Sequence, residues 1–363
     1  MFRGPILLLL SSLALAQLPF ASRLDAAVAP LFQANQPGGA LIVTQGGHVV
    51  YRKAFGMADL ARDIPMRPEM PFRIGSITKQ FTAVAVMMLV DEGRIALDDD
   101  VAKLLPEFPN GRGITVENLL THTSGLGNYN DRPQDAAAMA ADVTRKDILE
   151  AIAEDPPRFA PGEGVAYSNS GFYLLGLIIE KASGRPYADF LAERIFEPLG
   201  MRSTALEGRE RNGTKRVEGY MRGRGKPFEK APPISPTQSF SAGALISTVD
   251  DLALWDAAIT SGKLLKPETW RRIFTAYRLK TGEATRNCLG WVVDSHTFGR
   301  DIYMHAGGIN GFAAIAFRVP AEDLYVAVLL NNRGDTISAV HVGQTLLTAA
   351  LTARSSAAAR PPS

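Results

Sequence analysis

The sequence predicts an α/β protein of the α+β type: one antiparallel sheet built from both chain ends and flanked by helices, with an inserted, mainly helical lobe. Two observations support this prediction. The middle of the chain is mainly helical in its apolar pattern. Apolar strand-like runs lie on both sides of it, at 39–44, 48–55, 288–295, 301–305, 312–319 and 324–330. Pairing the early runs with the late ones buries their apolar faces in a single sheet.

These patterns define the expected domain organisation. We expect a single domain over residues 22–352. Its sheet lobe would comprise 22–75 and 241–352, and its helical lobe 76–240. The last residues, 353–363, are rich in Ala, Pro and Ser, which predicts a disordered tail. A cleft between the two lobes is the expected place for a site.

Local signals support the separate elements in order. A helix over 22–34 has apolar residues at helical spacing, but Pro30 should kink or interrupt it. The pair Gly46-Gly47 predicts a hairpin between the first two strands. Thr248 or Asp250 is a candidate cap of a later helix. Further helices are predicted from 77 onward and at 115–120, 134–155, 172–181, 187–195 and 337–352, and a long solvated loop at 208–230.

The composition is that of an ordinary globular protein. Of 363 residues, 46% are hydrophobic and 21% are charged. The formal net charge is +2, so no excess of basic residues indicates a nucleic-acid partner. The expected partner is instead a small-molecule or peptide substrate.

The N-terminus has the pattern of an export signal. Arg3 supplies a positive charge, residues 6–15 are mostly apolar, and Ala14-Leu15-Ala16 matches a cleavage site. The apolar run is too short to span a bilayer comfortably, so we expect no stable membrane span. We predict a signal peptide over 1–16 and a periplasmic or secreted mature protein; an uncleaved membrane anchor is the alternative.

The cysteine and histidine content argues against disulfides and metal sites. Cys288 is the single cysteine, so no internal disulfide can form, and its apolar surroundings predict a buried filler. The histidines show no metal-ligand spacing, and we expect no cofactor and no metal; they are His48, His122, His296, His305 and His341.

The first candidate motif is Ser76-Ile77-Thr78-Lys79, at the start of a largely apolar helix. Residues three apart share a helix face, so Lys79 should lie beside Ser76. A serine hydroxyl becomes a good nucleophile when a neighbouring base takes its proton, and a buried lysine can be that base. The helix start also offers N–H groups to an oxyanion. The alternative is an ordinary surface helix start.

The second candidate motif is Tyr167-Ser168-Asn169, which precedes an apolar helix. A phenol near a lysine can lose its proton more easily and act as a base. Asn169 could hold a substrate carbonyl or orient Lys79. The alternative is a partly buried tyrosine followed by a helix cap at Ser168 or Asn169.

The third candidate motif is His305-Ala306-Gly307-Gly308, at the end of a predicted strand. Glycines there would let a substrate carbonyl approach the strand edge, and the N–H of Gly308 could join that of Ser76 in an oxyanion hole. A satisfied turn histidine with hairpin glycines is the alternative. For His122, a turn-stabilising hydrogen bond is a better interpretation than catalysis.

Taken together, Ser76-x-x-Lys79, Tyr167-x-Asn169 and His305-x-Gly307 resemble the motifs of the penicillin-recognising serine hydrolases. The resemblance covers about 22–352 and is to the class C β-lactamase-like group, which includes D,D-carboxypeptidases, D-aminopeptidases and esterases. It implies a β-lactamase/transpeptidase-like fold. Many relatives have lysine where this sequence has His305, and that lysine helps to bind a substrate carboxylate.

By this resemblance, Ser76 is the acylated nucleophile, Lys79 and Tyr167 share proton transfer, and Asn169, His305 and Gly307 contact the substrate. The N–H groups of Ser76 and Gly308 form the oxyanion hole. The expected protein is an exported serine hydrolase that cleaves an ester or amide bond, peptide or lactam, through an acyl-enzyme. The alternative is a penicillin-binding or cell-wall-peptide-binding protein that is acylated without efficient turnover.

Overall fold

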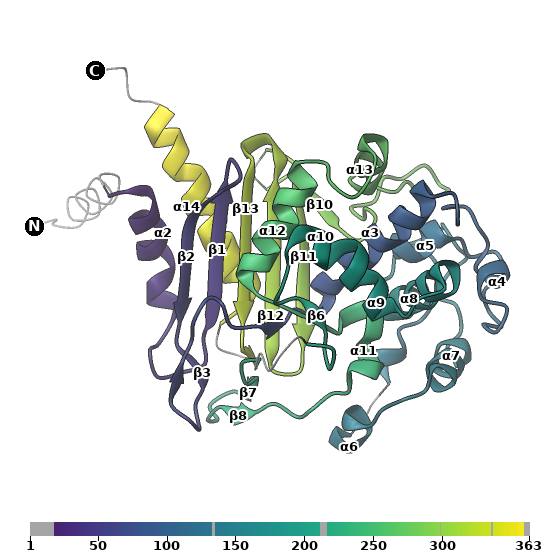
Figure 1. The fold of residues 1–363 in the computed structure, drawn as a ribbon, viewed down its shortest axis with the longest axis horizontal. Coiled ribbons are helices and arrows are strands. Elements are labelled where there is room, and N and C mark those ends of the chain that lie inside the picture. Colours follow the sequence, from purple (N-terminus) through teal and green to yellow (C-terminus); the bar gives the residue numbers. More distant parts are fainter. Residues whose placement is uncertain (1–17, 133–134, 211–215, 298, 335–336, 359–363) are drawn as a thin grey trace, which may run out of the picture.

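The computed structural model describes residues 18–132, 135–210, 216–297, 299–334 and 337–358. Its centre is a six-stranded sheet in the order β10-β11-β12-β13-β1-β2, and all neighbouring strands are antiparallel. The predicted fold class is therefore confirmed: early and late strands share one sheet (Figure 1). The strands are β1 (Gly39–Gln45), β2 (His48–Phe55), β10 (Val292–Asp294), β11 (Ile302–Ile309), β12 (Phe312–Val319) and β13 (Leu324–Leu330).

Two strand boundaries differ from the prediction, and glycines explain both. The run predicted at 288–295 is a strand only over Val292–Asp294, since Gly290 turns the chain with a φ of 80°. The strand predicted at 301–305 continues to Ile309, because the turn to β12 falls later, at Gly311, with a φ of 75°. The third motif therefore lies inside β11 rather than at its end.

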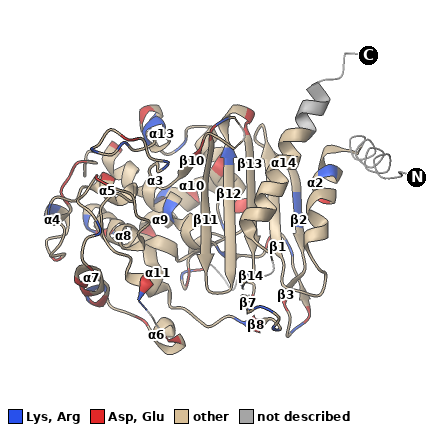
Figure 2. Cartoon of the chain, turned by 180° about the vertical axis from the view of Figure 1, so that it is seen from behind, with Lys and Arg blue, Asp and Glu red and all other residues tan. Residues whose placement is uncertain are grey.

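One face of the sheet is covered by helices from the two chain ends. These are α2 (Phe20–Val28) and α14 (Ala339–Ala358). Their buried residues pack on the sheet, and the described part of α14 is almost free of charge (Figure 2). The helix predicted over 22–34 changes to a 3-10 turn at Ala29–Leu31, where Pro30 interrupts it as expected.

The other face of the sheet packs on the helical part of the chain. A single apolar cluster runs from this face into the helices, so the two predicted lobes share one core. Thr248 caps α12, as one of the two predicted candidates. The helices are α3 (Thr78–Asp91), α4 (Val101–Leu104), α5 (Val116–Leu120), α6 (Ala136–Ala140), α7 (Arg145–Glu154), α8 (Asn169–Ser183), α9 (Tyr187–Leu191), α10 (Glu197–Leu199), α11 (Pro236–Gly243), α12 (Val249–Thr260) and α13 (Pro267–Ile273).

Short elements complete the fold. A π-helical turn, η4, spans Ala192–Phe196, and 3-10 turns lie at η2 (Gly75–Ile77), η3 (Tyr129–Asp131) and η5 (Pro320–Glu322). The short strands are β3 (Met57–Asp59), β4 (Ile64–Pro65), β5 (Phe72–Arg73), β6 (Ala205–Leu206), β7 (Tyr220–Arg222), β8 (Glu229–Lys230), β9 (Leu245–Ser247) and β14 (Asn332–Gly334).

Other predicted boundaries change for local reasons. The helix expected over 134–155 is two helices, since Thr144 forms a capping box that starts a new one. The loop expected at 208–230 contains β7 and β8. The backbone of α14 is helical to Ala358, so the first part of the expected tail over 353–363 continues the helix.

Two predictions concern export and the membrane. The predicted signal peptide, 1–16, lies outside the described residues. Across the part of the chain that the structure describes, no helix is both long enough and apolar enough to span a bilayer.

Candidate active site

Ser76 lies in η2, directly before α3, at a point where two sheets meet. Phe72 and Arg73 pair with β9, and the N–H of Ile74 donates to the carbonyl oxygen of Leu245 at 3.0 Å. Gly75 then turns the chain with a φ of 51°, a conformation that favours glycine. This turn fixes Ser76 just before α3, where its backbone N–H can donate a hydrogen bond to a negative ligand atom.

Lys79 lies one turn into the same helix, with its side chain fully buried. Its Nζ is 3.1 Å from Oγ of Ser76, 2.7 Å from Oδ1 of Asn169 and 2.7 Å from the carbonyl oxygen of Ala242. Desolvation lowers the pKa of Lys79 well below its ordinary value. The amine is therefore easier to deprotonate than an exposed lysine, and two fixed oxygens hold it against the serine.

The carbonyl of Ala242 reaches Lys79 through a strained turn in α11. Phe240 has a φ of 36° and a ψ of −127°, which is unusual for a bulky residue. The helix also approaches α8 closely, because a Cβ on Gly176 would lie 2.1 Å from Oγ of Ser241. Close helix packing and local strain together aim the Ala242 carbonyl into the core.

Tyr167 and Asn169 reach the site from the start of α8. The side chain of Ser168 caps this helix by accepting from the N–H of Gly171 at 3.3 Å, as one of the predicted alternatives. The hydroxyl of Tyr167 donates to Oγ of Ser76 at 2.7 Å. Desolvation raises the pKa of Tyr167 to about 12, although the residue as a whole is 45% exposed. The phenol is therefore neutral near pH 7.

His305 approaches from β11 and is buried, with 7% exposure. Its Nδ1 is 2.7 Å from the carbonyl oxygen of Ala306, and its ring centroid is 6.4 Å from that of Tyr167. The pKa of His305 is lowered to about 4, mainly by desolvation and to a smaller extent by the charge of the nearby Lys79. The imidazole is therefore neutral at physiological pH.

The backbone of β11 touches the turn that carries Ser76. A Cβ on Gly307 would lie 2.0 Å from the carbonyl oxygen of Ile74 and 3.3 Å from the nitrogen of Ser76. A Cβ on Gly75 would lie 2.7 Å from the nitrogen of Gly308. Only glycine fits these contacts, and they bring the backbone of Gly307 and Gly308 directly against the turn that carries Ser76.

His122 borders a cavity that Ser76 also lines, but its ring bonds to the segment that carries the second motif. Its Nδ1 accepts from the N–H of Ser168 at 3.2 Å, and its ring centroid is 4.6 Å from that of Tyr167. Its φ of 59° places it in a turn. The predicted hydrogen-bonding role in a turn is confirmed, and it supports the segment that carries Tyr167 and Asn169.

Two cavities meet at Ser76. One has a volume of about 730 Å³ and includes apolar walls from Val165, Trp291 and Val340. The other has a volume of about 330 Å³ and is bordered by polar residues such as Asn130. A substrate could thus extend to both sides of the serine.

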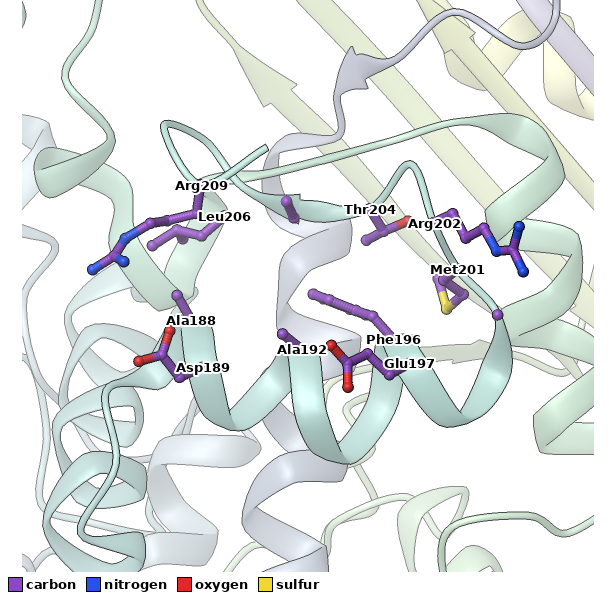
Figure 3. A pocket seen from close by; sticks show the side chains of 12 residues that line it. Ala188, Asp189, Ala192, Phe196, Glu197, Met201, Arg202, Thr204, Leu206 and Arg209 are labelled. Atoms are coloured by element: carbon purple, nitrogen blue, oxygen red, sulfur yellow. The ribbon is translucent and has the colours of Figure 1, made fainter. Parts of the chain in front are cut away.

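A third cavity lies elsewhere, between η4 and β6, with a volume of about 450 Å³ (Figure 3). Carboxylates and guanidinium groups border it, including Asp189 and Arg209, but none of the motif residues does. Within the described residues, no group of three or more His, Cys, Asp or Glu is placed to hold a metal ion. Cys288 is 1% exposed, as the buried filler predicted.

The structure brings together all the residues that the motifs singled out. Asn169 contacts Lys79, which is one of the two roles considered for it. Sequence reasoning missed Ala242, whose contribution is a backbone carbonyl and leaves no side-chain signal. It also missed Arg333, which borders both cavities from β14.

The chain is similar to known proteins over most of its length. It is 29% identical over 323 residues to "Penicillin-binding protein 4*" of Bacillus subtilis (strain 168), covering 84% of this chain and 70% of that protein. It is 29% identical over 326 residues to a "D-aminopeptidase" of Gluconobacter oxydans (strain 621H), covering 86% of this chain and 59% of that protein.

A solved structure is similar as well. The D-amino acid amidase of Ochrobactrum anthropi SV3, complexed with L-phenylalanine amide, superposes with a TM-score of 0.78 at 26% identity, covering 92% of this chain and 98% of that one. The family profile described as Beta-lactamase matches residues 21–349. The three motifs, the fold and this match agree, and the chain belongs to the Beta-lactamase family.

Proposed function

We propose that the chain is a serine hydrolase that cleaves an ester or amide bond through an acyl-enzyme on Ser76. The observation that carries this proposal is the set of contacts of Lys79. A neutral amine has two hydrogens and one lone pair. Oδ1 of Asn169 and the carbonyl of Ala242 can only accept, each at 2.7 Å, so together they take both hydrogens. The lone pair is then left for the hydroxyl hydrogen of Ser76.

The reaction follows from this arrangement. Lys79 accepts the proton of Ser76 while Oγ attacks the substrate carbonyl carbon. The resulting oxyanion accepts hydrogen bonds from the N–H groups of Ser76 and Gly308, whose approach the neighbouring glycines permit. Tyr167 donates its proton to the leaving oxygen or nitrogen, and the Lys79 ammonium restores that proton. The bond to the leaving group breaks, and the acyl group remains on Oγ until water removes it.

The similar proteins suggest a class of substrate. A D-aminopeptidase and a D-amino acid amidase among them favour an amide next to a D-configured residue. Esters, cell-wall peptides and β-lactams are the other members of the proposed range. We also propose export through residues 1–16, which N-terminal sequencing of the mature protein would test at Ala16.

The central test is acylation of one serine. Wild-type protein should turn over 4-nitrophenyl acetate and gain one acetyl group on Ser76 in a mass spectrum taken during turnover. Ser76→Ala should lose both signals, whereas Ser183→Ala, at the far end of α8, should keep both. Full activity in Ser76→Ala would contradict the proposal.

A second candidate is a binding protein that is acylated but releases its acyl group slowly. The raised pKa of Tyr167 favours it, because a neutral phenol with a pKa of about 12 is a weak base for activating the water of deacylation. The similarity to a penicillin-binding protein agrees with it. A stoichiometric burst of product followed by a negligible steady state would select this candidate, and sustained turnover would reject it.

A further inference from the structure

Arg333, on β14, lies beside the reacting serine but takes no part in the chemistry proposed above. Its guanidinium group lies flat on β11. A Cβ built on Gly308 would be 3.4 Å from Cζ of Arg333 and 3.5 Å from each terminal nitrogen. Arg333 therefore covers the strand segment whose N–H is the proposed oxyanion donor, within reach of a substrate bound there.

The guanidinium of Arg333 has no hydrogen bond or ion pair with any residue that the structure describes. Neighbouring arginines behave differently. Arg73 and Arg216 both pair with Glu207, at 2.7 Å and 3.2 Å. Arg73 and Arg216 are thus held by a carboxylate, whereas the guanidinium of Arg333 keeps its donors available to a ligand.

Arg333 borders both cavities that meet at Ser76. Among the described residues that line either cavity, it is the one Asp, Glu, Lys or Arg. Lys79 is enclosed behind the serine, and His305 is neutral, so neither supplies a positive charge to the surface of the site. Within the described residues, the site is therefore positive at a single point, and none of the carboxylates described there lines it to repel an anion.

A second unpaired group lies in the smaller cavity. The hydroxyl oxygen of Ser239 is buried and has no hydrogen-bond partner among the described residues, although Ser239 borders the same space as Arg333. A buried hydroxyl without a partner is costly unless a ligand satisfies it. A carboxylate has two acceptor oxygens and could take one bond from each residue.

We propose that Arg333 is a specificity-determining residue that binds a carboxylate of the substrate, with Ser239 as its second donor. This proposal rests on the hydrolase function proposed above and gives it a preference for carboxylate-bearing esters and amides, such as peptides with a free C-terminus.

The test compares substrates that differ only in charge. These are 4-carboxyphenyl acetate and 4-carbamoylphenyl acetate, together with their 3-substituted isomers, each corrected for its rate of hydrolysis by hydroxide. Wild-type kcat/KM should favour the carboxylate by about 10- to 100-fold in at least one isomer pair, the usual range for a charge-assisted hydrogen bond.

Variants test which residues cause the preference for the carboxylate substrate. Arg333→Gln should bring the ratio of kcat/KM close to one, mainly through KM, and Arg333→Lys should restore part of it. Ser239→Ala should lower it less. Arg222→Gln, on the neighbouring β7, is the control and should keep the wild-type ratio. A wild-type ratio near one in both isomer pairs, or a preference that survives Arg333→Gln, would overturn the proposal.

Binding measured without turnover separates this proposal from the hydrolase proposal. In Ser76→Ala protein, benzoate should bind at least about tenfold more tightly than benzamide by calorimetry, and adding Arg333→Gln should remove the difference. Benzoate preference in a protein whose wild type never acylates would support the carboxylate site and reject the hydrolase. Acylation with equal binding of the two ligands would do the reverse.

Discussion

The two faces of the central sheet are packed in different ways. On the outer face, α14 buries apolar side chains against the strands, among them Val342, Leu346 and Leu347. On the inner face, α3 buries a run of polar residues at its start, and each is hydrogen-bonded: Thr78 to Leu245, Lys79 to Ser76, Gln80 to Trp255 and Thr82 to Tyr187.

This difference separates the residues that stabilise the fold from the residues that orient the reactive groups. Apolar burial contributes free energy in proportion to area and sets no particular orientation. Buried hydrogen bonds contribute less net energy, but a wrong geometry leaves a costly unsatisfied group. The outer layer thus stabilises the sheet, and the inner layer fixes the reactive pair. The following predictions test this division, from the largest expected effect to the smallest.

Lys79→Met should slow the chemistry strongly and leave the fold stable. Acylation of Ser76 should slow by about 10³-fold, equivalent to about 4 kcal/mol, because the base is lost. The free energy of unfolding should change by less than about 1 kcal/mol, since the lost hydrogen bonds are offset by removing a desolvated amine. Stopped-flow acylation and urea denaturation measure the two effects, with the exposed Lys103→Met as control. A collapse of stability without loss of acylation rate would contradict the division.

Leu346→Ala should give the opposite result. It leaves a cavity under α14 and should lower the free energy of unfolding by about 2–5 kcal/mol. Turnover per folded molecule at 25 °C should stay within about twofold of wild type. Thermal unfolding followed by circular dichroism and active-site titration provide the measurements. If turnover fell in step with stability, the two faces would not be independent.

His305→Gln should change the pH dependence of stability. The pKa of His305 is about 4 in the folded chain, against an ordinary 6.5. Between these values the unfolded chain binds a proton that the folded chain does not, so acid destabilises the fold by up to roughly 3 kcal/mol. The variant should therefore lose less stability between pH 6.5 and 4. His122, whose pKa is also lowered, should leave a residual slope.

Urea denaturation at several pH values measures this effect. The exposed His296→Gln is the matched control and should keep the wild-type slope. If the slope in His305→Gln is unchanged, burial of this imidazole does not disfavour its charged form in the folded chain.

Cys288 offers the smallest and most local probe. Burial raises the pKa of its thiol to about 12, and the side chain is 1% exposed on the inner face. Native protein should therefore react with iodoacetamide at least about 10²-fold more slowly than unfolded protein. Mass spectrometry over time gives the rate. Rapid labelling of folded protein would mean that the inner layer opens more readily than its hydrogen bonds suggest.

Sequence reasoning was most successful where a local pattern determines the structure. The strand over 324–330 has the predicted bounds, because it is apolar throughout and flanked by turn residues. Thr248 caps its helix through a bond that spans only three residues. The spacing of Ser76 and Lys79 likewise follows from helix geometry alone.

The remaining features depend on distant parts of the chain. The Ala242 carbonyl reaches Lys79 across a separation of 163 residues. The neutral state of His305 results from burial among several elements, and the position of Arg333 depends on the parallel pairing of β14 with β7. None of these leaves a mark in a short window of sequence. The three motifs could identify the chemistry but not its surroundings.

The contact between the Ser76 turn and β11 also has a consequence for redesign. Since the smallest added side chain at Gly75 or Gly307 would collide with backbone atoms, mutational libraries at these positions should yield inactive clones. The walls formed by Val165 and Val340 are exposed and lack such limits. Efforts to evolve new selectivity should therefore randomise the rim and keep the glycine junction invariant.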